Sequence, residues 1–174
     1  REVNLNLANL RGAVMNQAVL TGANLRDAIM GRVSLSGADL TGSDLSRANL
    51  SIANLNRATL NRANLEEAGL SGADMRAAQL KGAILRGAIL RGAILGDADL
   101  SRADLSKANL RWANLSNANL TGADLTEVDL TDAEISPQVL AKARSVSKVE
   151  RADSTPYDVV PSAVATREGP LPSA

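Results

Sequence analysis

Hydrophobic residues recur every five positions along the first three quarters of the chain. From Leu5 to Leu130 every fifth residue is Leu or Met, and Ile135 ends the series. Two positions before each of them stands a small residue, which is Ala in all but four of the 27 units. A helix, with a period of about 3.6, would drift out of register within two units, and strand alternation has a period of about two. Neither regular element accounts for the pattern.

The period of five predicts a chain that turns a corner after every unit. We expect the Leu position, i, and the small position, i−2, to point inward, while the other three positions face solvent. Four units then close a square coil, and coils stack at the spacing of β-strands, about 4.8 Å. Units 1–135 predict about seven coils, stabilised by contacts between neighbours. One inward column, the core ladder, is Leu25, Leu45, Leu65, Leu85, Leu105 and Leu125.

The repeats resemble a known family. ANLSIANLNRATLNRANLEEAGL and ADLSRADLSKANLRWANLSNANL are similar to the A(D/N)LXX signature of pentapeptide repeat proteins. The resemblance covers residues 1–135 and implies an all-β fold, a right-handed quadrilateral parallel β-helix. Unlike many relatives the chain has no Phe, so the implied core is leucine. Members of this family are abundant in cyanobacteria and chloroplasts, including the thylakoid lumen, and many have no known activity.

The C-terminal end of the repeat is expected to carry a cap. Residues 136–146 predict a short α-helix, because Ser136 suits the N-cap and Pro137 the first helical position. Val139 and Leu140 would face the last coil. At the N-terminal end the repeat begins without a cap. This predicts cover by a partner, by further residues, or by a second copy through self-association.

Residues 147–174 change character. This segment holds four of the five prolines and no repeat, so it predicts an extended or disordered tail. Within it, PYDVVP places the only Tyr beside two valines. We interpret Tyr157, Val159 and Val160 as candidate contacts with a partner.

Composition narrows the function classes. The chain carries 19 basic and 19 acidic residues, so no global field steers it toward DNA, membranes or acidic substrates. It has no His or Cys, which removes the usual nucleophile–base pairs and zinc sites. At i−1, nine Asn and seven Asp interchange, which indicates hydrogen bonding to the corner backbone and not proton transfer. We expect no enzyme activity, no cofactor, no metal and no direct nucleic-acid binding.

The sequence leaves the compartment open. No apolar run approaches the roughly 18 residues of a membrane span, so no transmembrane segment is expected. The chain begins with Arg1 and not with Met, and no leader is visible. A cytoplasmic protein and a processed protein of the thylakoid lumen or periplasm both fit.

Three units in KGAILRGAILRGAILG break the polar pattern at i−1. Ile84, Ile89 and Ile94 would lie on three successive sides of one coil. Next to this apolar band lie Trp and Arg side chains, the residue types that are enriched in binding hot spots. The band therefore predicts a protein contact centred on Ile89. A recent duplication of one unit is the open alternative. The other residues of the predicted site, which stack beside Ile89, are Arg91, Arg111 and Trp112. A second apolar group at i−1 consists of Val14, Val19 and Ile29.

Three functions remain compatible with the sequence. The preferred one is a non-enzymatic protein–protein interaction scaffold or linker of a large multi-subunit assembly, which binds through the apolar band and the tail. The second is a DNA-mimicking, gyrase-binding protein, as in the quinolone-resistance members of the family. The neutral charge and the many arginines disfavour it. The third is a structural rod within a larger protein whose function lies on other segments.

Overall fold

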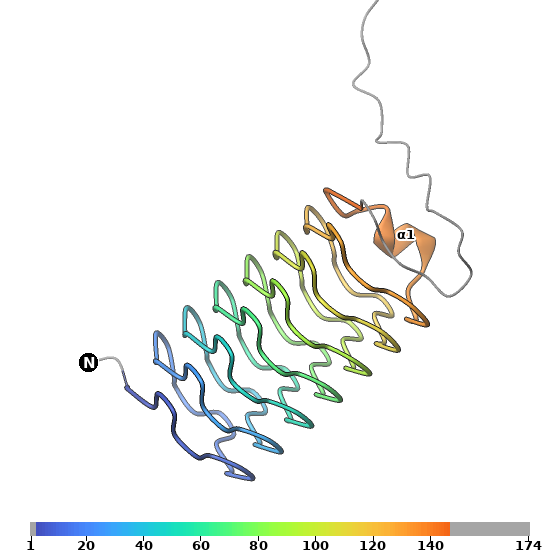
Figure 1. Cartoon of the computed structure of the whole chain (residues 1–174). Helices are drawn as coiled ribbons and strands as arrows, with labels where there is room; N and C mark the ends of the chain where they lie inside the picture. Colours follow the sequence, from blue (N-terminus) through green and yellow to red (C-terminus); the bar gives the residue numbers. More distant parts are fainter. Residues whose placement is uncertain (1–2, 147–174) are drawn as a thin grey trace, which may run out of the picture.

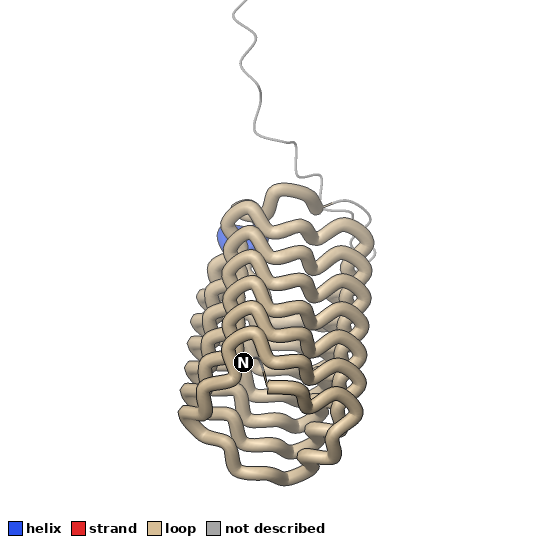
Figure 2. The backbone as a smooth tube through the Cα atoms, turned by 90° about the vertical axis from the view of Figure 1, so that its left-hand side faces the viewer, coloured by secondary structure: helices blue, strands red, loops and turns tan. Residues whose placement is uncertain are grey.

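Residues 3–146 are described by the structure, a computed structural model, and they form a rod of stacked coils (Figure 1). Parallel β-bridges join residues 20 apart, beginning with Asn4 and Asn24, so one coil consists of four units. Figure 2 shows the coils lying on one another in register. Outside the described residues lie the predicted tail and its three candidate contacts, Tyr157, Val159 and Val160.

Every corner of the coil has the same backbone geometry. The N–H of the i−2 residue donates to the carbonyl of the preceding i residue, as from Ala8 to Leu5 at 3.0 Å. The residue at i+2 has a φ between 54° and 71° in every unit from Leu7 to Asp132. A hydrogen-bonded turn with a positive φ only at its third residue is of type II. Gly adopts this φ without strain, whereas other residues pay roughly 1 kcal/mol.

Backbone hydrogen bonds join each coil to the next. The Leu5 N–H donates to the Asn24 carbonyl at 2.7 Å, and the Leu7 N–H donates to the Arg26 carbonyl at 3.0 Å. In return the Asn24 N–H donates to the Val3 carbonyl at 2.9 Å. Repetition of this set along the rod satisfies most backbone groups without continuous strands.

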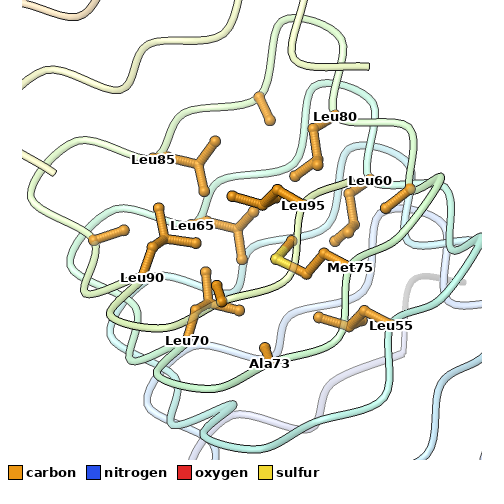
Figure 3. Packing of buried hydrophobic residues seen from close by; sticks show 14 of the residues in the cluster. Leu55, Leu60, Leu65, Leu70, Ala73, Met75, Leu80, Leu85, Leu90 and Leu95 are labelled. Atoms are coloured by element: carbon orange, nitrogen blue, oxygen red, sulfur yellow. The ribbon is translucent and has the colours of Figure 1, made fainter. Parts of the chain in front are cut away.

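The columns at i and i−2 fill the interior. From Ala23 to Leu125 these side chains have at most 2% of their surface exposed. Figure 3 shows leucines of neighbouring coils, with Met75 among them, pointing into one shared core. Ser43 is buried in place of Ala because its hydroxyl donates to the Leu40 carbonyl at 2.8 Å. The core ladder is buried throughout: Leu25, Leu45, Leu65, Leu85, Leu105 and Leu125.

One helical turn, α1 (Pro137–Leu140), lies on the last coil. The Ser136 side chain accepts a hydrogen bond from the Val139 N–H at 3.3 Å, and Pro137 occupies the first turn. Val139 and Leu140 are buried against the coil.

The helix ends earlier than the sequence predicts. The expectation of a helix over 136–146 is wrong beyond Leu140, because residues 141–146 run along the open edge of the last coil, where Ser145 forms a parallel bridge with Asp124. Pairing this edge satisfies backbone groups that a longer helix would leave exposed. The bonds are from the Gly122 N–H to Lys142 at 2.9 Å, from the Leu125 N–H to Ser145 at 3.0 Å, and from the Arg144 N–H to Ala123 at 2.8 Å.

Candidate protein-binding surface

Side chains at i−1 follow a hydrogen-bond rule. In every unit with Asn or Asp at this position, the side-chain Oδ1 accepts from the backbone N–H at i+1, at 2.9–3.2 Å. This Asx-turn satisfies a donor that coil stacking does not use. At two other corners an Asn of the preceding coil replaces it: Asn16 accepts from the Ser36 N–H and Asn61 from the Lys81 N–H, each at 3.0 Å.

Ile84, Ile89 and Ile94 break this rule. Their side chains are 38–46% exposed and cannot accept a hydrogen bond. They do not stack on one another, since Ile89, for example, bridges Gly69 and Asn109. Asn would satisfy each of these corners better, so local stability does not explain the isoleucines. At these three corners the backbone N–H groups of Arg86, Arg91 and Gly96 donate to no other group of the described chain.

Trp112 occupies an i+2 corner, where Gly is the relaxed residue. Its φ is 57°, and half of its surface is exposed. The guanidinium groups of Arg91 and Arg111 lie over the ring, 4.8 and 5.1 Å from its centroid. The indole Nε1 donates to Asp132 Oδ2 at 3.0 Å. Each exposed cation–π contact contributes about 0.5–1 kcal/mol, so the ring is held in place while it faces solvent.

The three isoleucines of the predicted band lie on three different sides of the rod. Ile89 bridges Asn109, and the corners that follow these two residues bring Arg91 to Arg111 and Trp112. We call Ile89, Arg91, Arg111 and Trp112 the Trp edge. Ile84 and Ile94 lie on the two adjoining sides and do not join it.

Ile52 belongs to the same edge, although it is absent from the predicted contact residues. It is 59% exposed, and its Cγ1 lies 3.7 Å from where a Cβ at Gly72 would stand. Counting back from Trp112 in steps of one coil passes Gly92 and Gly72 and then reaches Ile52. The 20-residue spacing of the sequence therefore already placed Ile52 on the same outer column as Trp112, one coil beyond the two glycines.

Ile29 lies next to Ile52. Both side chains, with those of Arg11 and Arg32, line a shallow hollow of about 220 Å³. One member of the second apolar group therefore lies beside the ladder of Trp112. The other two members, Val14 and Val19, lie on other sides of the first coil and are highly exposed.

Several carboxylates of the rod are held ionised. Arg47 bonds Asp27 through two nitrogens, at 2.8 and 2.6 Å, and lowers the pKa of that carboxyl. The Ser145 hydroxyl, at 2.6 Å, is the largest cause of a strongly lowered pKa at Asp124. A general acid at neutral pH needs a raised pKa, so neither carboxyl suits that role.

Residues 3–146 carry neither a candidate metal site nor a candidate membrane helix. They contain no group of three or more side chains placed to hold a metal ion. They also contain no helix with the length and apolarity needed to cross a lipid bilayer.

The repeat and its coil define the class of protein. The family model for pentapeptide repeats matches in 8 copies, over residues 4–42, 18–51, 43–82, 53–92 and 93–132. The protein belongs to the pentapeptide repeat family, whose solved members share its right-handed β-helix.

Solved structures of related proteins cover much of the rod. A pentapeptide repeat protein of the Arabidopsis thaliana thylakoid lumen is 34% identical with a TM-score of 0.50, covering 59% of this chain and 71% of that chain. Rfr23 of the cyanobacterium Cyanothece 51142 is 41% identical with a TM-score of 0.41, covering 57% and 62%. QnrB1, a plasmid-mediated fluoroquinolone resistance protein, is 17% identical with a TM-score of 0.44, covering 82% and 77%. No curated protein matches the chain.

Proposed function

We propose that this protein is a non-enzymatic interaction scaffold that binds a protein partner through the Trp edge. The observation that carries the proposal is the position of Trp112, half exposed, with Arg91 and Arg111 over its ring and Ile89 beside it. Trp and Arg are the residue types most enriched in binding hot spots, and an aliphatic neighbour supplies the apolar contact. A ring already fixed by its neighbours loses little conformational entropy on binding.

The isoleucines support the same function. Each gives up a corner hydrogen bond that every Asn and Asp at i−1 makes, and none gains a stacked apolar neighbour in exchange. A residue that the fold does not need points to a contact outside the fold. We assign Ile84 and Ile94 to secondary contacts that flank the Trp edge.

The proposal extends to an assembly. In it the rod is a rigid spacer, and the segment with Tyr157, Val159 and Val160 is a second point of attachment to a large complex. Self-association through the uncapped N-terminal end stays a prediction.

A DNA-mimicking, gyrase-binding function is the weaker candidate. A surface that imitates DNA must be negative, because DNA carries one charge per phosphate. The Trp edge instead presents Arg91 and Arg111, and the formal net charge of the chain is zero.

Affinity capture from an extract of the producing cells, followed by mass spectrometry, tests the function. The baits are the full chain, a triple variant with Asn at positions 84, 89 and 94, and Trp112→Gly. The matched control is Thr59→Asn, which places Asn at i−1 on a side without the band. We expect one partner set to be captured by the full chain and the control, and lost with the other two. Identical capture by all four would refute the proposal.

A further inference from the structure

A longer surface runs lengthwise along the Trp edge. Bridges connect Ile29 through Asn49 and Gly69 to Ile89, three coil steps of about 4.8 Å each, or roughly 14 Å. On the adjacent corner, Ile52 leans over Gly72, and Trp112 lies three rungs beyond Ile52. The apolar side chains therefore form two clusters, one at each end of a stretch that contains three glycines.

The same edge has a local excess of positive charge. We call eight residues of this edge the basic strip, and all but the half-buried Arg111 are exposed: Arg11, Ile29, Arg32, Ile52, Ile89, Arg91, Arg111 and Trp112. On the three ladders that form it, no carboxylate occurs between Asn9 and Trp112. Among the described residues only one of these arginines forms a salt bridge, Arg111 with Asp129 at 3.6 Å. The chain as a whole has equal numbers of acidic and basic residues, so this separation of charge is specific to the edge.

Resting on the proposed function, we infer that the basic strip binds an acidic segment of a partner protein that carries two apolar anchors. One anchor enters the hollow formed by Ile29 and Ile52, and the other packs on Ile89 and Trp112. Carboxylates of the segment pair with Arg11, Arg32 and Arg91, which form no salt bridge within the described part of the chain, whereas Arg111 is already paired with Asp129. The anchors lie roughly 14 Å apart, the span of about four residues of extended chain.

Other occupants fit less well. Single-stranded nucleic acid needs successive aromatic platforms for its bases, whereas the strip has one ring, over which two arginines already lie. In a second copy of the rod, six of the described carboxylates are already engaged in salt bridges of the rod itself. Asp27 and Asp74, for example, are bonded at 2.6 Å to Arg47 and Arg76.

The test selects ligands from a library of short random peptides displayed against the immobilised full chain. Affinities of the selected peptides are measured by fluorescence polarisation, and emission of Trp112, the only Trp, reports on its end of the strip. One double variant, Ile29→Asn with Ile52→Gly, removes the far cluster with residues that suit those corners. A second, Arg32→Gln with Arg91→Gln, removes charge. The matched controls are Thr59→Asn and Arg62→Gln, which lie off the strip.

We expect selected peptides to be enriched in Asp, Glu and large apolar residues. Both double variants should weaken binding by about tenfold or more, the controls should not, and added salt should weaken it further. Peptides without acidic enrichment, or equal affinity for the double variants, would overturn the inference. So would a single-stranded oligonucleotide that binds the strip more tightly than the peptides.

Capture of the natural partner by the different variants distinguishes this inference from the proposed function. A partner that is captured through Trp112 but is indifferent to Ile29→Asn with Ile52→Gly leaves the scaffold function standing and removes the strip. Loss of the partner with Trp112→Gly and also with Ile29→Asn and Ile52→Gly supports both the scaffold function and the basic strip.

Discussion

The hydroxyl of Ser145 donates to Oδ1 of Asp124 at 2.6 Å, and this bond ties the chain after α1 to the coil beneath it. The same carboxylate accepts from the Thr126 hydroxyl at 2.6 Å and from Arg144 at 3.0 Å. One side chain therefore organises a corner and also holds the closing segment. In the other coils no side chain has to hold a closing segment, because the next coil pairs with that edge.

Removing this carboxylate should loosen the cap. We expect Asp124→Ala to lower the free energy of unfolding by about 1–3 kcal/mol, since a charged acceptor with several donors is lost. Asp124→Asn should lower it less, because Oδ1 still accepts at the corner while the attraction to Arg144 disappears. Urea denaturation measures both changes. Asp97→Ala, at an exposed corner, is the control and should have little effect.

The stability of the rod should fall only in acid. Hydrogen bonds lower the pKa of Asp124, chiefly from Ser145, and that of Asp74, chiefly from Arg76. A carboxyl with a lowered folded-state pKa stabilises the fold above its unfolded pKa of about 3.9, and this contribution is lost as the pH falls through the folded value. The chain has no His, so nothing in its side chains titrates normally between about pH 5 and 8.

Thermal unfolding across pH checks this expectation. The Tm should be flat from about pH 8 to pH 5 and decline below about pH 4, and Asp124→Asn should show a shallower acid decline. A Tm that drops between pH 8 and pH 5 would contradict the assignment.

Asn at position 89 should change the stability of the fold little. We expect Ile89→Asn to stay within about 1 kcal/mol of the wild-type stability, because a new corner hydrogen bond offsets the lost apolar contact. The reciprocal change one coil later, Asn109→Ile, removes the bond to the Arg111 N–H and should lower stability by about 1 kcal/mol. Differential scanning calorimetry compares the two. A loss above about 2 kcal/mol in Ile89→Asn would make the isoleucine a structural residue.

The interior should tolerate changes of shape but not of volume. Leu85→Ala, at a side chain 1% exposed, should lower the free energy of unfolding by about 2–5 kcal/mol through the cavity it creates. Met75→Leu conserves volume and should cost less than about 1.5 kcal/mol. Chemical denaturation of both variants measures the difference, and equal losses would mean that packing at this level is not tight.

The inward columns could be predicted because every unit meets the same steric demand. A corner every five residues leaves room for one large and one small side chain, so Leu25 and Ala28 follow from period alone. The role of Asn and Asp at i−1 was predicted for a similar reason, since a free N–H recurs at each corner.

The rest depends on competition between distant groups. SPQVLAKAR has good helix signals at Ser136 and Pro137, yet the edge at Gly122 and Leu125 offers the backbone more bonds than a second helical turn. Helix propensity depends on the local sequence alone and does not include the hydrogen bonds that this edge offers. Ile52 was missed because its neighbours on the edge, Gly72 and Trp112, are separated from it by 20 and 60 residues.

Because the coil has four equal sides, an insertion that leaves the core unchanged can still rearrange the surface. Inserting one five-residue unit between Ile52 and Ile89 would leave every Leu and Ala pointing inward, with the corner geometry intact. All residues downstream would nevertheless advance by one side, a quarter turn about the rod axis. Ile29 and Ile52 would then face a different direction from Trp112. An insertion of one, two or three units thus rotates one half of the surface against the other while the inward columns stay unchanged.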